Sequence, residues 1–174
     1  MGANDLELPD GALASLAGRV GRVLGGDASG RGLRVGVACS RFNGGVTWRL
    51  LTGALAFLEE SGVDRSDVSV AWVPGAFELP LAARRFATAT AAADAVVCLG
   101  AVIRGETGHY DLVAGECAAG IQRVQLDTGV PVAFGVLTTE TLDQALARSE
   151  PDETNKGREA AQAALEMCRL LRSV

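Results

Sequence analysis

The sequence predicts an α/β fold in which a parallel sheet is covered by helices on both faces. Short apolar segments of strand length alternate, four times over, with longer segments whose apolar residues recur at helical spacing. This alternation is typical of βαβ units with right-handed crossovers. A polar or glycine-rich interruption follows each predicted strand. In this topology the four interruptions share one edge of the sheet, which is where open α/β sheets bind ligands.

Residues 1–32 differ from the rest of the chain, and we expect them to form an N-terminal arm that is partly mobile or used in assembly. Residues 12–24 predict a short amphipathic helix, because one stripe carries Leu13, Leu16, Val20 and Leu24. Residues 25–32 are rich in glycine and are typical of a flexible linker. Residues 33–174 are expected to form a single domain.

Within that domain, apolar patterning predicts strands over residues 33–39, 68–73, 95–100 and 131–137. Helices are predicted over residues 46–61, 78–88, 110–126, from 141 onward, and 155–172. Gly62 suits the end of the first of these helices. Thr141, with Gln144 three residues later, predicts a capping box at the start of the fourth.

Composition excludes several classes of function. The net charge of −5 argues against general nucleic-acid binding, but it still permits a small phosphorylated substrate. The four cysteines form no Cys-x-x-Cys pair, and a single histidine gives no zinc-ligand spacing. No signal peptide pattern and no apolar segment of membrane-spanning length are present. We therefore expect a cytoplasmic protein with reduced thiols.

Residues 102–110, Val-Ile-Arg-Gly-Glu-Thr-Gly-His-Tyr, carry the strongest chemical signal. They connect the third predicted strand to a helix, and the free N–H groups of a helix start bind anions. They also contain His109, the only histidine of the chain. An imidazole can transfer protons near neutral pH. From the residues alone, His109 is equally compatible with a structural role at the helix start, and Thr107 with a simple helix cap.

Several motifs occur in order from about residue 33 to 172 and resemble the 6,7-dimethyl-8-ribityllumazine synthase family. They are Ser40-Arg-Phe-Asn, Val73-Pro-Gly-Ala-Phe-Glu, Leu99-Gly-Ala-Val-Ile-Arg-Gly-Glu-Thr, His109-Tyr-Asp, Phe134-Gly-Val-Leu-Thr-Thr, Gln144-Ala-Leu-Ala-Arg and Asn155-Lys-Gly. The resemblance implies a flavodoxin-like three-layer sandwich with a four-stranded parallel sheet. It also implies homopentamers, either free or closed into an icosahedral shell, with active sites between subunits.

The family's reaction joins 5-amino-6-(D-ribitylamino)uracil to 3,4-dihydroxy-2-butanone 4-phosphate and releases phosphate and water, as the penultimate step of riboflavin biosynthesis. The resemblance implies no metal or organic cofactor, no nucleic-acid or membrane partner, and riboflavin synthase as a candidate partner. It assigns proton transfer to His109 and the phosphate to Gly105, Glu106, Thr107 and Arg148. It assigns the ribitylaminouracil to Phe42, Asn43, Ala76, Phe77, Glu78, Val102, Ile103, Phe134 and Lys156, with Phe134 and Arg148 reaching across a subunit boundary.

Two other readings remain open. One is a noncatalytic paralogue that binds flavins or lumazines, or that serves as a shell. The intact set of Phe42, Glu78, His109, Arg148 and Lys156 favours an enzyme instead. The other is a general flavodoxin-like nucleotide-binding domain. It is disfavoured because no Gly-x-Gly-x-x-Gly motif opens a helix and no P-loop lysine is present.

Overall fold

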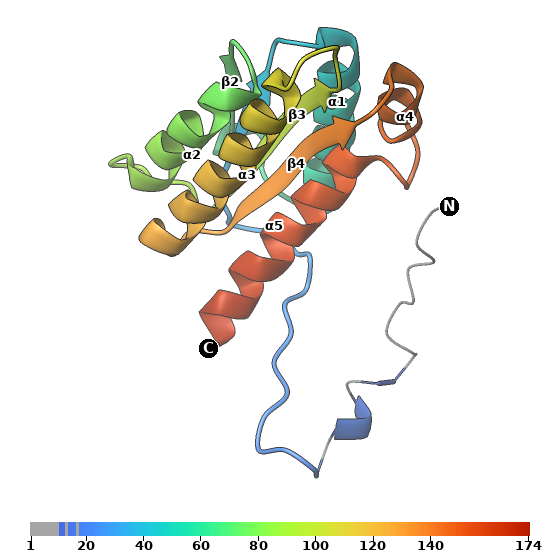
Figure 1. The fold of residues 1–174 in the computed structure, drawn as a ribbon. Coiled ribbons are helices and arrows are strands. Elements are labelled where there is room, and N and C mark those ends of the chain that lie inside the picture. Colours follow the sequence, from blue (N-terminus) through green and yellow to red (C-terminus); the bar gives the residue numbers. More distant parts are fainter. Residues whose placement is uncertain (1–10, 13, 17) are drawn as a thin grey trace.

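The computed structural model describes residues 11–12, 14–16 and 18–174, and it has the expected three layers (Figure 1). The middle layer is a four-stranded parallel sheet in the order β2-β1-β3-β4. The strands are β1 (Val35–Ser40), β2 (Val68–Val73), β3 (Ala95–Ile103) and β4 (Val132–Thr139). The predicted flavodoxin-like fold class is confirmed.

Helices cover both faces of this sheet. Those on one face are α1 (Gly44–Glu60) and α5 (Lys156–Ser173), and those on the other are α2 (Leu79–Thr88) and α3 (His109–Thr128) (Figure 1). The short helix α4 (Leu142–Ala147) lies beyond the end of β4. Short 3₁₀ helices are η1 (Ala14–Leu16), η2 (Arg65–Asp67) and η3 (Ala76–Glu78).

The sheet divides the hydrophobic core into two halves, because successive side chains of a strand point to opposite faces. On β3, Val97 and Leu99 pack with α1 and α5. Their neighbours Val96 and Cys98 pack with α2 and α3. The two central strands are therefore apolar without interruption, as expected for a parallel sheet buried on both faces.

Most predicted boundaries lie within a few residues of the observed ones. The largest change is in β3, which continues to Ile103 because it pairs with β4 as far as Thr139. Pairing with β1, in contrast, ends at Leu99 in the residues described. The last four residues of β3 thus extend past its β1 neighbour, at the edge of the sheet where the loops gather.

The helix ends follow local signals in the sequence. Gly62, after α1, has a left-handed φ of 83°, as a glycine helix stop requires. At the start of α4, Thr141 Oγ1 accepts a hydrogen bond from the backbone N–H of Gln144 (3.2 Å). The reciprocal half of the predicted capping box differs, because Gln144 Oε1 accepts from the N–H of Glu140 (3.0 Å).

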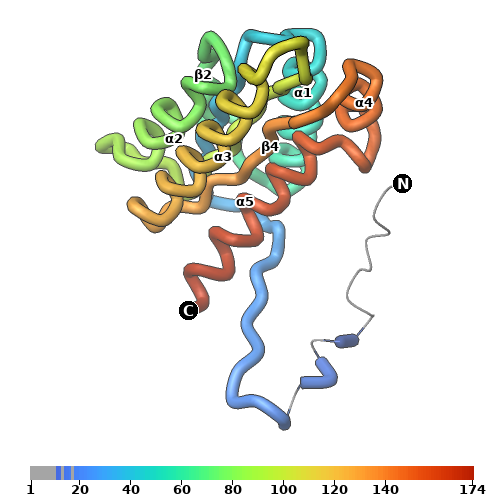
Figure 2. Tube along the Cα trace, viewed as in Figure 1, coloured from blue at the N-terminus to red at the C-terminus, as the bar shows by residue number. Residues whose placement is uncertain are grey.

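The helix predicted over residues 12–24 was wrong in the described part of that segment. Only η1 is helical there, and residues 22–30 have no regular structure. Gly18, with a left-handed φ of 81°, interrupts the segment, and glycine lowers helix stability. Leu13 lies outside the described residues. Residues 22–31 leave the three layers and lie beside the carboxyl-terminal half of α5, where Arg169 donates to Ser29 O (2.8 Å) and Arg31 O (2.7 Å) (Figure 2).

Candidate functional site

One group of predicted site residues gathers at the carboxyl ends of β1, β2 and β3, and we call it the edge cluster. It comprises Phe42, Asn43, Ala76, Phe77, Glu78, Val102, Ile103, Gly105, Glu106, Thr107 and His109. The loops after β1 and β2 are joined by a hydrogen bond from the N–H of Phe42 to Pro74 O (3.1 Å). Helix α3 packs against η3, so the third loop adjoins the second.

Asn43 connects the first loop to β3. It has a left-handed φ of 56°, a conformation that asparagine tolerates better than most residues. Its Nδ2 donates to the carbonyl of Ala101 (2.9 Å), beyond the point where β1 pairing stops. This bond uses one of the two N–H groups of Nδ2, so the second N–H and the Oδ1 acceptor of this amide remain for a ligand.

Glu78 holds the second loop in shape. Its Oε2 accepts a hydrogen bond from the backbone N–H of Gly75 (2.9 Å), which closes the turn before η3. The other carboxylate oxygen can then accept from a ligand hydroxyl. Two phenylalanines of the cluster are unusually exposed for their type, Phe42 at 69% and Phe77 at 58%. Exposed flat rings beside acceptors suit a planar polar ligand.

The third loop places His109 at the first position of α3, with an exposed side chain. Gly108 is the N-cap, and no side chain caps the helix. Thr107 Oγ1 accepts only a long bond from the N–H of His109 (3.4 Å). The interpretation of Thr107 as a simple helix cap is therefore weak. A long helix whose first turn lacks a side-chain cap presents N–H groups to an anion.

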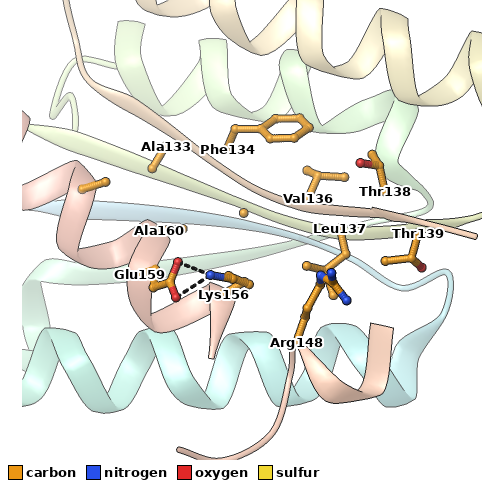
Figure 3. A pocket seen from close by; sticks show the side chains of 12 residues that line it. Ala133, Phe134, Val136, Leu137, Thr138, Thr139, Arg148, Lys156, Glu159 and Ala160 are labelled. Carbon is orange, nitrogen blue, oxygen red and sulfur yellow. Dashed lines mark hydrogen bonds and ion pairs between the residues drawn. The ribbon is translucent and has the colours of Figure 1, made fainter. Parts of the chain in front are cut away.

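A second group lies in an open groove of about 430 Å³ along the outer edge of β4 (Figure 3). Phe134, Arg148 and Lys156 line this groove. Figure 3 shows Arg148 and Lys156 on one side of the β4 ribbon and Phe134 on the other. Phe134 is 43% exposed, because β4 is an edge strand without a neighbour beyond it in the described residues.

The two cations of the groove are fixed through the backbone between α4 and α5. Arg148 is the C-cap of α4, and its carbonyl accepts from the N–H of Lys156 (3.0 Å). Its guanidinium donates one bond, to Gln144 O (3.0 Å), which leaves further donors for an anion. Lys156 Nζ contacts both carboxylate oxygens of Glu159, at 2.6 and 2.7 Å.

The edge cluster and the groove do not form one cavity within a single chain. All residues that line the groove come from β4, Arg148 and α5. None comes from the loops after β1, β2 or β3. That Phe134 and Arg148 serve a site on a neighbouring copy stays a prediction.

Arg104 has the densest set of contacts beside the edge cluster, although the sequence did not single it out. It forms ion pairs with Asp111 and Glu140 and stacks on the ring of Tyr110. The sequence offered only a weak signal, an arginine seven residues before an acidic residue in the first turn of a helix. Its other acidic partner, Glu140, follows strand β4, so no local sequence pattern predicts this contact.

All four cysteines are buried and unpaired. Burial raises the pKa of the Cys39 thiol to about 11 and that of Cys117 to about 11, so neither is an activated nucleophile. Within the described residues, no group of three or more histidine, cysteine or acidic side chains could hold a metal ion. The described helices also include none with both the length and the apolar character needed to cross a bilayer.

Comparison with known families adds an independent finding. The family model of 6,7-dimethyl-8-ribityllumazine synthase matches residues 32–172. The match includes the whole sheet and both groups of site residues, and it begins where the N-terminal arm ends. The chain therefore belongs to the 6,7-dimethyl-8-ribityllumazine synthase family of riboflavin biosynthesis.

Proposed function

We propose that the protein condenses 5-amino-6-(D-ribitylamino)uracil with 3,4-dihydroxy-2-butanone 4-phosphate to form 6,7-dimethyl-8-ribityllumazine, releasing phosphate and water. The observation that carries this proposal is the third loop. It combines an uncapped helix start with the chain's only histidine, in a member of this family. The reaction needs an amine and a carbonyl held together, a phosphate leaving group and proton transfers around an imine. Positioning and proton transfer are tasks that this loop suits.

The phosphate is bound by the N–H groups of Gly105, Glu106 and Thr107 together with the Thr107 hydroxyl. The Glu106 carboxylate points away from it, because like charges repel. Arg148 completes the site with its planar fork, which can pair with two phosphate oxygens. His109, four residues after Gly105, then transfers protons beside the phosphorylated ketone.

The ribitylaminouracil lies on the opposite side of the loop. Its ring stacks on Phe42, and its ribityl hydroxyls bond to Asn43 Oδ1 and Glu78. Ala76 and Phe77 line the same wall, and the backbone of Val102 and Ile103 pairs with the uracil edge. Support comes from the extension of β3 beyond its pairing with β1. One side of this extension pairs with β4, and the side without a neighbouring strand keeps backbone groups for a ligand.

The complete site forms between two copies of the chain. Phe134, Arg148 and Lys156 of a neighbouring copy close over the edge cluster of the first. The separation of the groove from the edge cluster supports this arrangement. So do the leucines exposed on α2 and α3, Leu81 (74%), Leu112 (66%) and Leu126 (72%), which an assembly would cover.

The assembly is a homopentamer, either free or closed into an icosahedral shell, and a mass measurement in solution separates the two. Riboflavin synthase is the candidate protein partner, because it consumes the lumazine. We place the enzyme in the cytoplasm, where four unpaired cysteines stay reduced.

The decisive experiment supplies both substrates to the purified, assembled protein and follows lumazine formation optically. The His109→Ala variant should lose about 10²- to 10⁴-fold in kcat, the usual contribution of a general acid–base group. Absence of product with the assembled wild-type protein would contradict the proposed reaction and favour a noncatalytic binding or shell-forming relative. Product formation with near wild-type turnover by His109→Ala would contradict only the role of the histidine.

A further inference from the structure

Arg104 connects three segments that meet around the third loop. Its backbone N–H donates to Thr139 O at the end of β4 (2.9 Å). Its guanidinium forms a two-pronged pair with Asp111 in the first turn of α3, at 3.1 and 3.3 Å. Its Nε bonds to Glu140 after β4 (3.0 Å). The guanidinium carbon also lies 4.0 Å from the centre of the Tyr110 ring.

These contacts surround a segment that has few of its own. In the part of the chain that the structure describes, residues 105–108 make two polar contacts, both short-range. They are the long bond from the N–H of His109 to Thr107 and a bond from the N–H of Asp111 to Gly108 O (3.2 Å). Gly105 and Gly108 are the first and last residues of the segment, and glycine leaves the backbone conformationally free. The position of the segment therefore depends on its two ends.

Arg104 holds both ends. Its own backbone is the amino end of the segment, and its side chain grips Tyr110 and Asp111 at the carboxyl end. The fork to Asp111 is a directional contact, since two parallel bonds fix the orientation of both groups. Asp111 and Glu140 also raise the pKa of the Arg104 guanidinium, so this group keeps its charge. We call the contacts of the Arg104 side chain with Tyr110, Asp111 and Glu140 the clamp.

We propose that Arg104 is a positioning residue, which fixes the loop 105–108 and His109 in the geometry that receives the phosphorylated ketone. This inference rests on the proposed function. Arg104 itself does not touch the reacting atoms, because each of its three side-chain nitrogens bonds to Asp111 or Glu140. Its contribution is to preorganise the N–H groups and the imidazole, and a misplacement of about 1 Å can cost about a hundredfold in rate.

The test compares two variants. Arg104→Met removes the guanidinium but keeps a side chain of similar length, and Asp111→Asn weakens the same contact by removing the charge of the partner carboxylate. Arg123→Met is the matched control, because it breaks an exposed ion pair with Asp127 on the same helix. Amide hydrogen exchange of the assembled proteins is measured first, since it needs no substrate. Exchange should accelerate in the peptide covering residues 104–112 for both clamp variants and stay unchanged there for the control.

Steady-state kinetics then distinguish a positioning role of Arg104 from a general contribution to folding. In Arg104→Met, the KM for the butanone phosphate should rise about tenfold and kcat should fall by about ten- to a hundredfold, while the KM for the ribitylaminouracil stays constant. Loss of folded protein would lower kcat and leave both KM values unchanged. Binding of inorganic phosphate, measured by calorimetry, should weaken about tenfold in Arg104→Met and stay constant in Arg123→Met.

Every outcome of these measurements either supports or overturns the proposed role of Arg104. Unchanged exchange in residues 104–112 overturns the clamp, whatever the kinetics. Faster exchange with wild-type kcat and KM values overturns its role in positioning. If the wild-type protein forms no lumazine, the proposed reaction fails, and the positioning role is then judged by exchange and phosphate binding. Accelerated exchange together with weakened phosphate binding would sustain the clamp in that case.

Discussion

Replacing Asn155 by alanine should destabilise the chain strongly and disturb the groove. The side chain is 1% exposed and makes four hydrogen bonds. Oδ1 accepts from the N–H groups of Gly157 (2.9 Å) and Arg158 (3.2 Å), which caps α5. Nδ2 donates to the carbonyls of Glu150 (2.8 Å) and Arg49 (3.3 Å), and so connects the α4–α5 loop to α1.

The expected loss follows from these bonds. Removing an asparagine cap costs about 1 kcal/mol. Each of the two donated bonds adds about 1 kcal/mol, and more where a buried carbonyl is left without a partner. The Asn155→Ala variant should therefore lose about 3 kcal/mol in the free energy of unfolding. Because Lys156 follows directly and bonds to Arg148 O, the variant should also bind inorganic phosphate more weakly.

The assay is urea denaturation at several protein concentrations, since assembly couples stability to concentration. Asn155→Asp is the matched variant, because it keeps the oxygen that accepts both cap bonds but replaces the donor with an oxygen that faces two carbonyls. It should be destabilised by at least about 2 kcal/mol, because the loop contacts are lost and the buried carboxylate is repelled by the two carbonyls. A free energy of unfolding for Asn155→Ala within about 0.5 kcal/mol of wild type would refute this account of the residue.

Three further predictions concern packing, substrate binding and alkaline pH. Gly157→Ala should destabilise the protein by about 1–3 kcal/mol, because its Cβ would lie 2.0 Å from the backbone oxygen of Leu50, whereas Gly115→Ala, with open space around its Cβ, should be neutral or stabilising in the same urea assay. Arg148→Lys should raise the KM for the butanone phosphate by about tenfold in steady-state kinetics, because lysine keeps the charge but loses the fork; an unchanged value would remove Arg148 from the phosphate site. The Cys39 thiol has a pKa raised by burial from 9.0 to about 11, so its contribution to stability is complete below pH 9.0 and is lost as pH rises toward about 11. Cys39→Ala should flatten the stability profile over that interval, and superimposable profiles would contradict the assignment.

Local sequence patterns predicted most of the helices and strands. Apolar segments such as 95–100 identified strands, because a buried parallel strand needs uninterrupted apolar residues. Thr141 and Gly62 marked helix ends, since caps act within three or four residues. The same reasoning failed over residues 12–24, where an apolar stripe suggested a helix that Gly18 interrupts. An amphipathic pattern alone does not outweigh the conformational freedom of glycine when no core packs against it.

By itself, the sequence determined the chemistry available to this protein. The motifs from residue 40 to 157 and the position of His109 at a helix start are local features, and they suffice to indicate the family. The tertiary structure alone decided how those residues are divided between the edge cluster and the groove on β4. It also decided the partners of Arg104, because Asp111 and Glu140 lie on separate elements. Such contacts depend on the order of strands in the sheet, which joins segments that no local pattern relates.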